Sequence, residues 1–276
     1  MANHHRSVVI HPTAIVDDGA EIGSGVSIGA YTIIGPKVKV GDGTWIGPHV
    51  VIEGHTELGP ENMVYQFASL GSHPQDLKYH GEPSTLIIGA RNKIREFVTL
   101  QPGTEHGRMS TRVGDENLFM ANCHVGHDCI VGSKNVFANS TALAGHVTID
   151  NNVILGGLVG IHQFCRIGDF SLIGAGSMVS SDVPPYCLVQ GDRAHLRGVN
   201  VIGLERGGFQ DTEIKDIRRT YRHLFATVGH LEAKVKSLPA DLKDQPVVRG
   251  MVEFITSSKR GVCKPLRELR SGGPTE

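Results

Sequence analysis

An apolar side chain recurs at every sixth position through most of the first 180 residues. One run reaches from Ile10 to Leu70 without a missing member, and after two interruptions the repeat continues from Val113 to Val179. A period of six fits neither an α-helix, which repeats every 3.6 residues, nor a plain strand, which alternates every two. It is typical of a short strand followed by a corner, so that three units make one coil of about 18 residues in a parallel β-helix.

The same period predicts how the interior is filled. Each apolar side chain should point inward and stack on its counterpart one coil later, at the interstrand distance of about 4.8 Å. Aromatic residues make up only 5% of the chain, and we expect small β-branched residues to fill a narrow three-sided prism in which aromatic rings would not fit. Glycine often follows the apolar residue, as in EIGSGVSIG, and we expect it to supply the unusual backbone angles of the corners. By analogy, prisms of this repeat type are left-handed and usually trimeric.

Two polar, turn-rich segments interrupt the repeat, residues 72–85 and 101–112. We expect both to be loops that leave the prism, where specific function often lies. The repeat ends at the DVPP sequence of residues 182–185, because proline has no backbone N–H to donate to the hydrogen-bond ladder of a central strand. From about residue 211 the apolar residues have helical spacing. The sequence therefore predicts an all-β domain over residues 1–190 and a small α-helical domain over residues 191–276, with a disordered tail at residues 271–276.

The composition argues against several classes of function. The formal net charge of −1 provides no general positive field for nucleic acid. No apolar stretch approaches the about 20 residues that cross a bilayer, and the first residues have no signal-peptide pattern. The five cysteines show no framework spacing, which is typical of reduced thiols. We therefore expect a cytoplasmic protein that is not an integral membrane protein and does not bind nucleic acid.

Four histidines gather in the second run of repeats: His124, His127, His146 and His162. With about 18 residues per coil, three of them, His127, His146 and His162, fall within one residue of a single column along one edge of the prism. Surface histidines at tolerant corners would produce the same pattern. A column beside a groove would instead place several imidazoles within reach of one bound molecule.

Three kinds of chemistry could use such a column. Residues 123–129, CHVGHDC, contain metal-ligand types, but Val125 should point inward and the tight C-x-x-C spacing is absent, so we expect no metal. Cys123 or Cys129 could be a nucleophile, although no nucleophile motif surrounds them. A neutral imidazole could act as general base toward a hydroxyl, and an acyl thioester would then need no nucleophile from the enzyme. A metal-dependent β-helix hydratase and a non-catalytic β-helix scaffold remain alternatives.

Several motifs resemble those of the UDP-N-acetylglucosamine O-acyltransferases, in order and with compatible spacing from His11 to about Phe225. The motifs are QDLKYHGEP (75–83), NKIREFVT (92–99), HVGHDC (124–129), ANSTALAGHV (138–147), IHQFCRIG (161–168), DVPPY (182–186) and RGVNVIGLERGGF (197–209). The resemblance implies the first step of lipid A biosynthesis. The 3-hydroxyl of UDP-N-acetylglucosamine would attack the thioester of a 3-hydroxyacyl acyl carrier protein directly, with no cofactor.

The resemblance also implies roles for individual residues. His127 matches the general base, Asp128 the acidic residue that orients it, and Gly145 the backbone N–H that stabilises the oxyanion. Asn200 and Arg206 match contacts on the nucleotide side, where an arginine suits a diphosphate. The other matched substrate-contacting positions are Asp76, Lys78, His124, His146, His162 and Gln163. In this family the site lies between neighbouring prisms of a homotrimer.

Some positions depart from the family pattern. Gln101, Ile202 and Gly207 stand where the family often has His, Glu and Arg. Gln101 lies beside the reacting sugar position and is included among the substrate-binding candidates, so transfer to a 3-amino sugar, which makes an amide, stays open as the alternative. Ala175 matches the floor of the acyl groove, where Gly admits a longer chain. Its methyl group, together with Met178, predicts a chain shorter than the longest that the family accepts.

The carrier protein is acidic in this family, so a basic surface should receive it. The candidates on the predicted C-terminal helix are Lys215, Arg218, Arg219 and Arg222. An ordinary solvated helix face would show the same charges.

Overall fold

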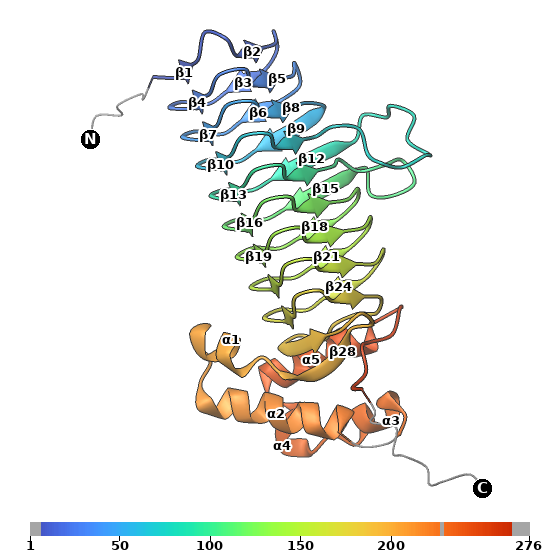
Figure 1. Cartoon of the computed structure of the whole chain (residues 1–276). Coiled ribbons are helices and arrows are strands. Elements are labelled where there is room, and N and C mark those ends of the chain that lie inside the picture. The colour runs from blue at the N-terminus through green and yellow to red at the C-terminus, as the bar shows by residue number, and fades with distance from the viewer. Residues whose placement is uncertain (1–6, 227–228, 267–276) are drawn as a thin grey trace, which may run out of the picture.

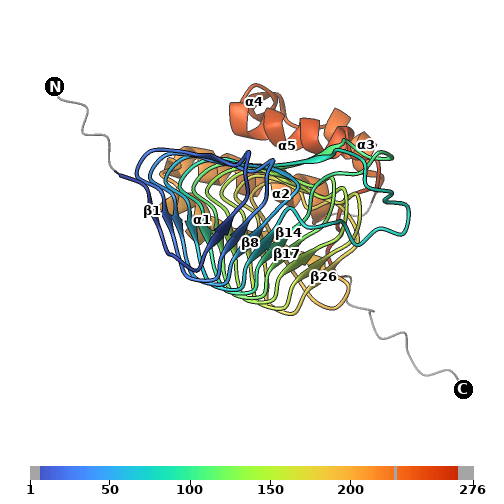
Figure 2. The same cartoon turned by 90° about the horizontal axis from the view of Figure 1, so that it is seen from above.

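Stacked coils of backbone form a long column in the computed structural model, which describes residues 7–226 and 229–266 (Figure 1). Each coil contributes one short strand to each of three sheets, and seen from above the coils outline a three-sided prism (Figure 2). This left-handed parallel β-helix, followed by a small group of helices, confirms the predicted fold class.

The three sheets contain eleven, nine and eight strands. The first sheet contains β1 (Val9–Ile10), β4 (Ser27–Ile28), β7 (Trp45–Ile46), β10 (Met63–Val64), β13 (Lys93–Ile94), β16 (Leu118–Phe119), β19 (Val136–Phe137), β22 (Ile154–Leu155), β25 (Leu172–Ile173), β27 (Cys187–Gln190) and β28 (His195–Val199). The second contains β2 (Ile15–Val16), β5 (Ile33–Ile34), β8 (Val51–Ile52), β11 (Ser69–Leu70), β14 (Thr99–Leu100), β17 (His124–Val125), β20 (Ala142–Leu143), β23 (Gly160–Ile161) and β26 (Met178–Val179). The third contains β3 (Glu21–Ile22), β6 (Lys39–Val40), β9 (His55–Leu58), β12 (Thr85–Ile88), β15 (Ser110–Val113), β18 (Ile130–Val131), β21 (Thr148–Ile149) and β24 (Arg166–Ile167).

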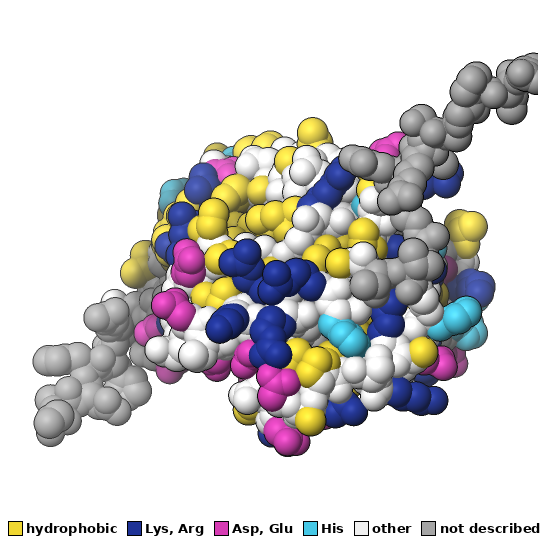
Figure 3. Space-filling model, turned by 90° about the horizontal axis from the view of Figure 1, so that it is seen from below, with side chains coloured by type: hydrophobic (Ala, Val, Ile, Leu, Met, Phe, Trp, Pro, Cys, Tyr) yellow, Lys and Arg dark blue, Asp and Glu magenta, His cyan; other side chains and the backbone are white. Residues whose placement is uncertain are grey.

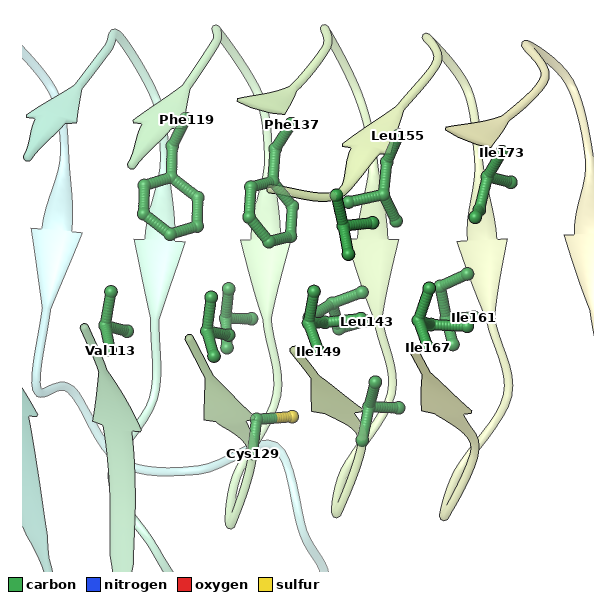
Figure 4. Close-up of a cluster of buried hydrophobic side chains, with 14 of the residues drawn as sticks. Val113, Phe119, Cys129, Phe137, Leu143, Ile149, Leu155, Ile161, Ile167 and Ile173 are labelled. Atoms are coloured by element: carbon green, nitrogen blue, oxygen red, sulfur yellow. The ribbon is translucent and has the colours of Figure 1, made fainter. Parts of the chain in front are cut away.

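The last residue of most two-residue strands points into the prism and is buried, as the six-residue period predicts. The expectation that aromatic rings would not fit is wrong at two positions. Phe119 and Phe137 are fully buried in consecutive coils, with their ring centroids 4.5 Å apart (Figure 4). They fit because a ring that stacks on its neighbour occupies only the height of one coil.

Most glycines that follow the apolar residues serve a different purpose from the predicted one, although Gly71 does adopt a left-handed backbone angle (φ 82°). The left-handed backbone angle lies two positions after the glycine, usually on a residue of another type. Examples are Tyr31 (φ 58°), two residues after Gly29, and Asp128 (φ 60°), two residues after Gly126. Gly41 instead allows close approach between coils, since a Cβ there would lie 2.5 Å from the carbonyl carbon of Gly59. The corner therefore selects glycine for space, and leaves the left-handed position free to carry an outward side chain.

Two loops leave the prism on the same side, residues 71–84 between β11 and β12, and residues 101–109 between β14 and β15 (Figure 1). The second loop is shorter than predicted, because Ser110 and Thr111 pair with β12 and belong to β15. Both loops therefore connect the second sheet to the third, at the corner where these sheets meet.

The C-terminal part covers one end of the prism (Figure 1). Its helices are α1 (Val201–Arg206), α2 (Asp211–Phe225), α3 (Leu231–Lys236), α4 (Ala240–Lys243) and α5 (Pro246–Thr256). β28 pairs with β27 and extends the first sheet into the segment predicted to be helical, so the change to helix comes after residue 199. The tail predicted to be disordered, residues 271–276, lies outside the described residues. No helix in the described part of the chain is long and apolar enough to cross a membrane.

The close approach at Gly41 leads to a stability prediction. Gly41→Ala should lower the free energy of unfolding by about 1–3 kcal/mol, the usual cost of forcing an extra methyl group into a packed site. Urea denaturation measures the effect. Gly250→Ala in α5 is the control, because a Cβ at Gly250 meets no atom within 4 Å, and it should stabilise by about 0.5–1 kcal/mol. Equal stability of Gly41→Ala and the wild type would contradict this explanation of the glycines.

Candidate active site

His127 and Asp128 lie together at the corner between the second and third sheets, directly after β17. His127 is 8% exposed, and its Nδ1 lies 2.8 Å from Oδ2 of Asp128. A carboxylate only accepts hydrogen bonds, so Nδ1 carries the proton and Nε2 keeps a free lone pair. Nε2 lies 3.9 Å from Oδ2 of Asp76 in the first loop. This arrangement suits a general base.

Asp128 is completely buried, which is unusual for a carboxylate. Burial by itself would raise the pKa of this carboxyl group. Hydrogen bonds from the Thr104 hydroxyl, from His127 and from the backbone of Arg108 more than offset the burial, and the pKa lies below its ordinary value. Asp128 is therefore an anion at neutral pH and a strong acceptor for the His127 ring.

His146 lies one coil beyond Asp128, with its Nε2 3.9 Å from Oδ2 of Asp128. Its ring meets the His127 ring edge-on, with centroids 5.0 Å apart, and stacks on Phe164 at 4.5 Å. Burial lowers the pKa of His146, so the neutral ring is favoured beside His127. Phe164 was missed by the sequence reasoning, although it occupies the corner position one coil after His146.

Gly145 lies against the His127 ring, and a Cβ there would come within 2.5 Å of Cε1 and Nε2. Only glycine leaves this space for the imidazole. Within the described residues the Gly145 N–H donates no hydrogen bond, so it can act as a donor next to Nε2. These two properties are what the predicted oxyanion role requires.

The predicted histidine column is only partly present. The structure brings His127 and His146 together, but His162 lies on the neighbouring column and is exposed, as is Gln163. The coil period is 18 residues, so the position one coil beyond His146 belongs to Phe164 rather than His162. His124 points outward from β17, and its Nδ1 lies 2.7 Å from the Thr99 hydroxyl. Burial, and then the charge of His127, lower the pKa of His124.

An apolar groove of about 620 Å³ runs along the second sheet from this corner toward the helical end. Its lining is His124, Ala142, Leu143, Ala144, Gly160, Ile161, His162, Met178, Val179, Ser180, Asp192 and Arg193. Met178 narrows the groove, since its Sδ lies 2.7 Å from where a Cβ of Gly160 would be. Ala175, predicted as the groove floor, is exposed and does not line the groove within one chain.

The first loop brings Asp76 to the corner. Its Oδ1 accepts a hydrogen bond from the Lys78 N–H at 3.0 Å, while the Lys78 side chain is exposed. Gln101 is 5% exposed, and its Oε1 accepts from the Gln75 N–H at 3.2 Å. Gln101 therefore contacts the loop segment next to Asp76.

The predicted nucleotide-side residues lie elsewhere. Asn200 and Arg206 line a second groove of about 620 Å³ on the first sheet, together with Ile202 and Gly207. The Asn200 side chain donates to the Phe170 carbonyl at 2.9 Å and accepts from a backbone N–H at the start of α1, so it also caps that helix. Arg206 is exposed.

These two groups of residues face different sides of the prism. The general-base candidate and the apolar groove belong to the second sheet and its corner with the third, whereas Asn200 and Arg206 belong to the first sheet. A single chain does not bring them to one site.

The cysteines near His127 point away from it. Cys123 and Cys129 are buried in the prism, where their thiols donate to the carbonyls of Ala138 and Ala144. Burial raises the pKa of Cys123 to about 11 and that of Cys129 to about 12, which disfavours the thiolate needed for covalent catalysis or zinc binding.

Ligand-type atoms of His127, Asp128 and His146 do lie within 4.8 Å of one another. The Asp128 carboxylate already accepts four hydrogen bonds, two on each oxygen. A metal ion would have to displace some of these donors, so the residue set does not favour a metal site.

The sequence reasoning missed the partners of Asp128. Thr104 and Arg108, in the loop of residues 101–109, supply most of its hydrogen bonds. The only sequence signal was that this loop interrupts the repeat.

A left-handed β-helix with an imidazole–carboxylate pair near an apolar groove is typical of the hexapeptide-repeat acyltransferases, and the comparisons with known proteins agree with this class. Residues 182–263 match the family model described as UDP-N-acetylglucosamine O-acyltransferase, domain 2. The acyl-[acyl-carrier-protein]–UDP-N-acetylglucosamine O-acyltransferase of Aliarcobacter butzleri is 48% identical over 253 residues, which cover 92% of this chain and 97% of the relative. The corresponding protein of Halorhodospira halophila is 47% identical over 255 residues, 92% and 99% of the two chains.

A solved structure supports the same conclusion. The UDP-N-acetylglucosamine O-acyltransferase of Moraxella catarrhalis superposes with a TM-score of 0.89 at 42% identity, and covers 92% of this chain and 99% of its own. The chain belongs to the UDP-N-acetylglucosamine O-acyltransferase family. The predicted family and the prediction that the protein is an acyltransferase enzyme are confirmed.

Proposed function

We propose that this protein transfers a 3-hydroxyacyl chain from acyl carrier protein to the 3-hydroxyl of UDP-N-acetylglucosamine, the first step of lipid A biosynthesis, in the cytoplasm. The observation that carries the proposal is the His127 ring, whose Nδ1–H is held by Asp128 and whose Nε2 lies against Gly145, the residue that follows Ala144 of the apolar groove. The substrates named for the relatives from Aliarcobacter butzleri and Halorhodospira halophila support it.

The proposed reaction is one direct displacement that needs no cofactor. His127 Nε2 takes the proton of the sugar hydroxyl as its oxygen attacks the thioester carbonyl carbon. The Gly145 N–H donates to the developing oxyanion, and the carbon–sulfur bond then breaks. His127 returns the proton to the departing thiol of the carrier, so no charge is left on the enzyme. Asp128 stabilises the imidazolium that exists between these two proton transfers.

The acyl chain would lie in the apolar groove of the second sheet. We infer that Met178 limits its length more strongly than Ala175, because Met178 narrows the groove over Gly160 whereas Ala175 lies outside it. A 3-amino sugar remains the alternative nucleophile, with His127 as base in both cases. Gln101 is buried against the first loop and accepts a hydrogen bond from Gln75, the residue before Asp76. It would therefore affect the choice between the 3-hydroxyl and the 3-amino sugar through the position of Asp76.

The first test is an acyl-transfer assay with both UDP-sugars and a series of 3-hydroxyacyl carrier protein thioesters. His127→Ala should lower the rate by about 10²–10⁴-fold, the usual contribution of a general base. His11→Ala, which changes an exposed histidine of the first coil, should leave the rate unchanged. Full activity of His127→Ala would contradict the general-base role. The absence of acyl transfer by both the wild type and His127→Ala would support the scaffold alternative, and stoichiometric zinc or iron in the active purified protein would support the hydratase alternative.

We further propose that the working enzyme is a homotrimer in which each site combines two chains. The catalytic corner and the Asn200–Arg206 groove face different sides of one prism, so a second copy must supply one of them. Exposed apolar side chains also follow the second sheet and its corner with the first: Ile15, Ile33, Tyr31, Phe67 and Phe97. Such a patch is typical of a covered surface.

Intersubunit complementation tests this arrangement. His127→Ala and Arg206→Ala should each have little activity alone, whereas co-expressed, differently tagged mixed trimers should recover part of the wild-type rate. Recovery is expected because some interfaces then pair an intact His127 with an intact Arg206. Light scattering should give about three times the chain mass of 29.7 kDa. An active monomer, or no recovery in verified mixed trimers, would refute the shared site.

A basic cluster on α2 is the proposed docking surface for acyl carrier protein. Lys215, Arg218 and Arg222 line a hollow on the helical end, together with the acidic Glu205 and Asp211. Lys and Arg side chains gather there (Figure 3), and within the described residues the three basic side chains form no ion pair. Arg219, also a candidate, forms ion pairs with Asp216, at 3.4 Å, and with Asp241, at 2.8 Å. Its charge is therefore already paired and less available to an acidic partner. An acidic partner would complement the three unpaired charges.

Charge neutralisation within this one helix tests the docking surface. Arg218→Gln and Arg222→Gln should each raise KM for the acyl carrier protein by about fivefold at low salt, as expected for one exposed ion pair. The increase should shrink as salt screens the charges. Arg219→Gln is the matched control and should leave this KM unchanged. An equal effect of all three substitutions, or of none, would contradict the proposed surface.

A further inference from the structure

The Asp128 carboxylate is enclosed by the second loop, residues 101–109. Its Oδ1 accepts hydrogen bonds from the N–H groups of Thr104, at 3.2 Å, and Arg108, at 2.5 Å. Its Oδ2 accepts from the Thr104 hydroxyl at 2.6 Å and from His127 Nδ1 at 2.8 Å. Three of the four donors therefore come from a segment that is not part of the prism.

The loop closes tightly over this carboxylate. A Cβ at Gly107 would lie 2.2–2.3 Å from the carboxylate carbon and both oxygens of Asp128, so the backbone approaches as closely as a glycine allows. The Arg108 guanidinium also donates to the Asp128 backbone carbonyl. A second link anchors the loop, because Glu82 Oε1 accepts from the Glu105 N–H at 2.9 Å.

These contacts determine what the carboxylate can do for His127. A buried carboxyl group without donors tends to take up a proton, and a protonated group would offer a competing O–H donor. With two donors on each oxygen, the group stays an acceptor and cannot rotate without losing hydrogen bonds. The Nδ1–H of His127 then has one fixed acceptor, and Nε2 is held against Gly145.

We propose that the loop of residues 101–109 is a positioning element for catalysis, in which Thr104 and the Arg108 N–H hold Asp128 so that it orients His127. The proposal rests on the proposed function of His127 as general base. Thr104, Gly107 and Arg108 are positioning residues, since they act through Asp128 and contact no reacting atom.

Thr104→Val tests the proposal, because it keeps the shape of the side chain and removes the hydroxyl. The rate constant kcat should fall by about tenfold, as expected for the loss of one hydrogen bond to a charged group, while KM for the sugar stays unchanged. Thr104→Ser should restore most of kcat. Thr111→Val is the matched control in the adjacent strand β15, because the Thr111 hydroxyl is buried with no hydrogen-bond partner among the described residues. It should leave kcat unchanged.

A double-mutant cycle separates positioning from a general structural effect. In an Asp128→Ala background, Thr104→Val should change kcat by less than about twofold, because the group through which Thr104 acts is gone. The thermal unfolding temperature of each variant, measured in parallel, shows whether the variant is folded at the temperature of the assay. Additive tenfold losses in the two backgrounds would show that Thr104 acts independently of Asp128 and would overturn the proposal.

The same measurements distinguish the two levels of inference. If Thr104→Val keeps the wild-type kcat while His127→Ala is inactive, the positioning role is wrong and the proposed acyl transfer stands. If the wild-type protein transfers no acyl group to either sugar, the proposed function itself fails.

Discussion

Backbone hydrogen bonds between successive coils are the interaction on which the rest of this structure depends. Ile33 N–H, for example, donates to the Val50 carbonyl at 2.9 Å, and the same offset recurs along all three faces. Because the paired residues of successive coils are nearly always 18 positions apart, as Ile33 and Val51 are, every position of a coil lies above its counterpart. The chain can therefore build columns of like side chains, both inside the prism and along its corners.

The candidate active site uses this register at one corner. Asp128 and His146 occupy the same position in consecutive coils, and so do His127 and Gly145. The His127 ring therefore lies beside the His146 ring and fills the space that the missing side chain of Gly145 leaves. The left-handed backbone at Asp128 is part of the ordinary corner geometry, as it is at Tyr31 and many other residues. The regular fold thus brings the imidazole, its carboxylate and a backbone donor together without a separate structural device.

The regular fold does not by itself supply the hydrogen-bond donors that the buried Asp128 carboxylate requires. A charge at 0% exposure requires donors, and the prism offers too few at a corner. The loop of residues 101–109 supplies them, and its contact with Glu82 couples it to the loop that carries Asp76. The two interruptions of the repeat therefore act together at the same corner, which explains why a periodic chain contains two irregular segments so close in sequence.

The division of the predicted site residues between two faces has a similar physical origin. The inward side chains fill the core of the prism and leave no interior space for a large substrate. The two grooves therefore lie on outer faces. Residues that follow the prism, such as Asn200 and Arg206, return along the first sheet because β27 and β28 extend that sheet. This geometry is the reason for expecting a shared site between copies.

The amino-acid sequence by itself determined the coil, since a six-residue period has one simple solution and most inward positions can be counted from Ile10 to Leu70 and again from Val113 to Val179. It also determined that His127 and His146 lie near each other, because both positions follow from the coil length. Only the tertiary structure decided that the His162 side chain is exposed, that Phe119 and Phe137 fit the core, and that the glycines provide space between coils. It alone showed that Thr104 and Arg108 reach Asp128. These contacts come from segments without a period, and a loop's path depends on which distant hydrogen bonds it satisfies, which local sequence patterns do not encode.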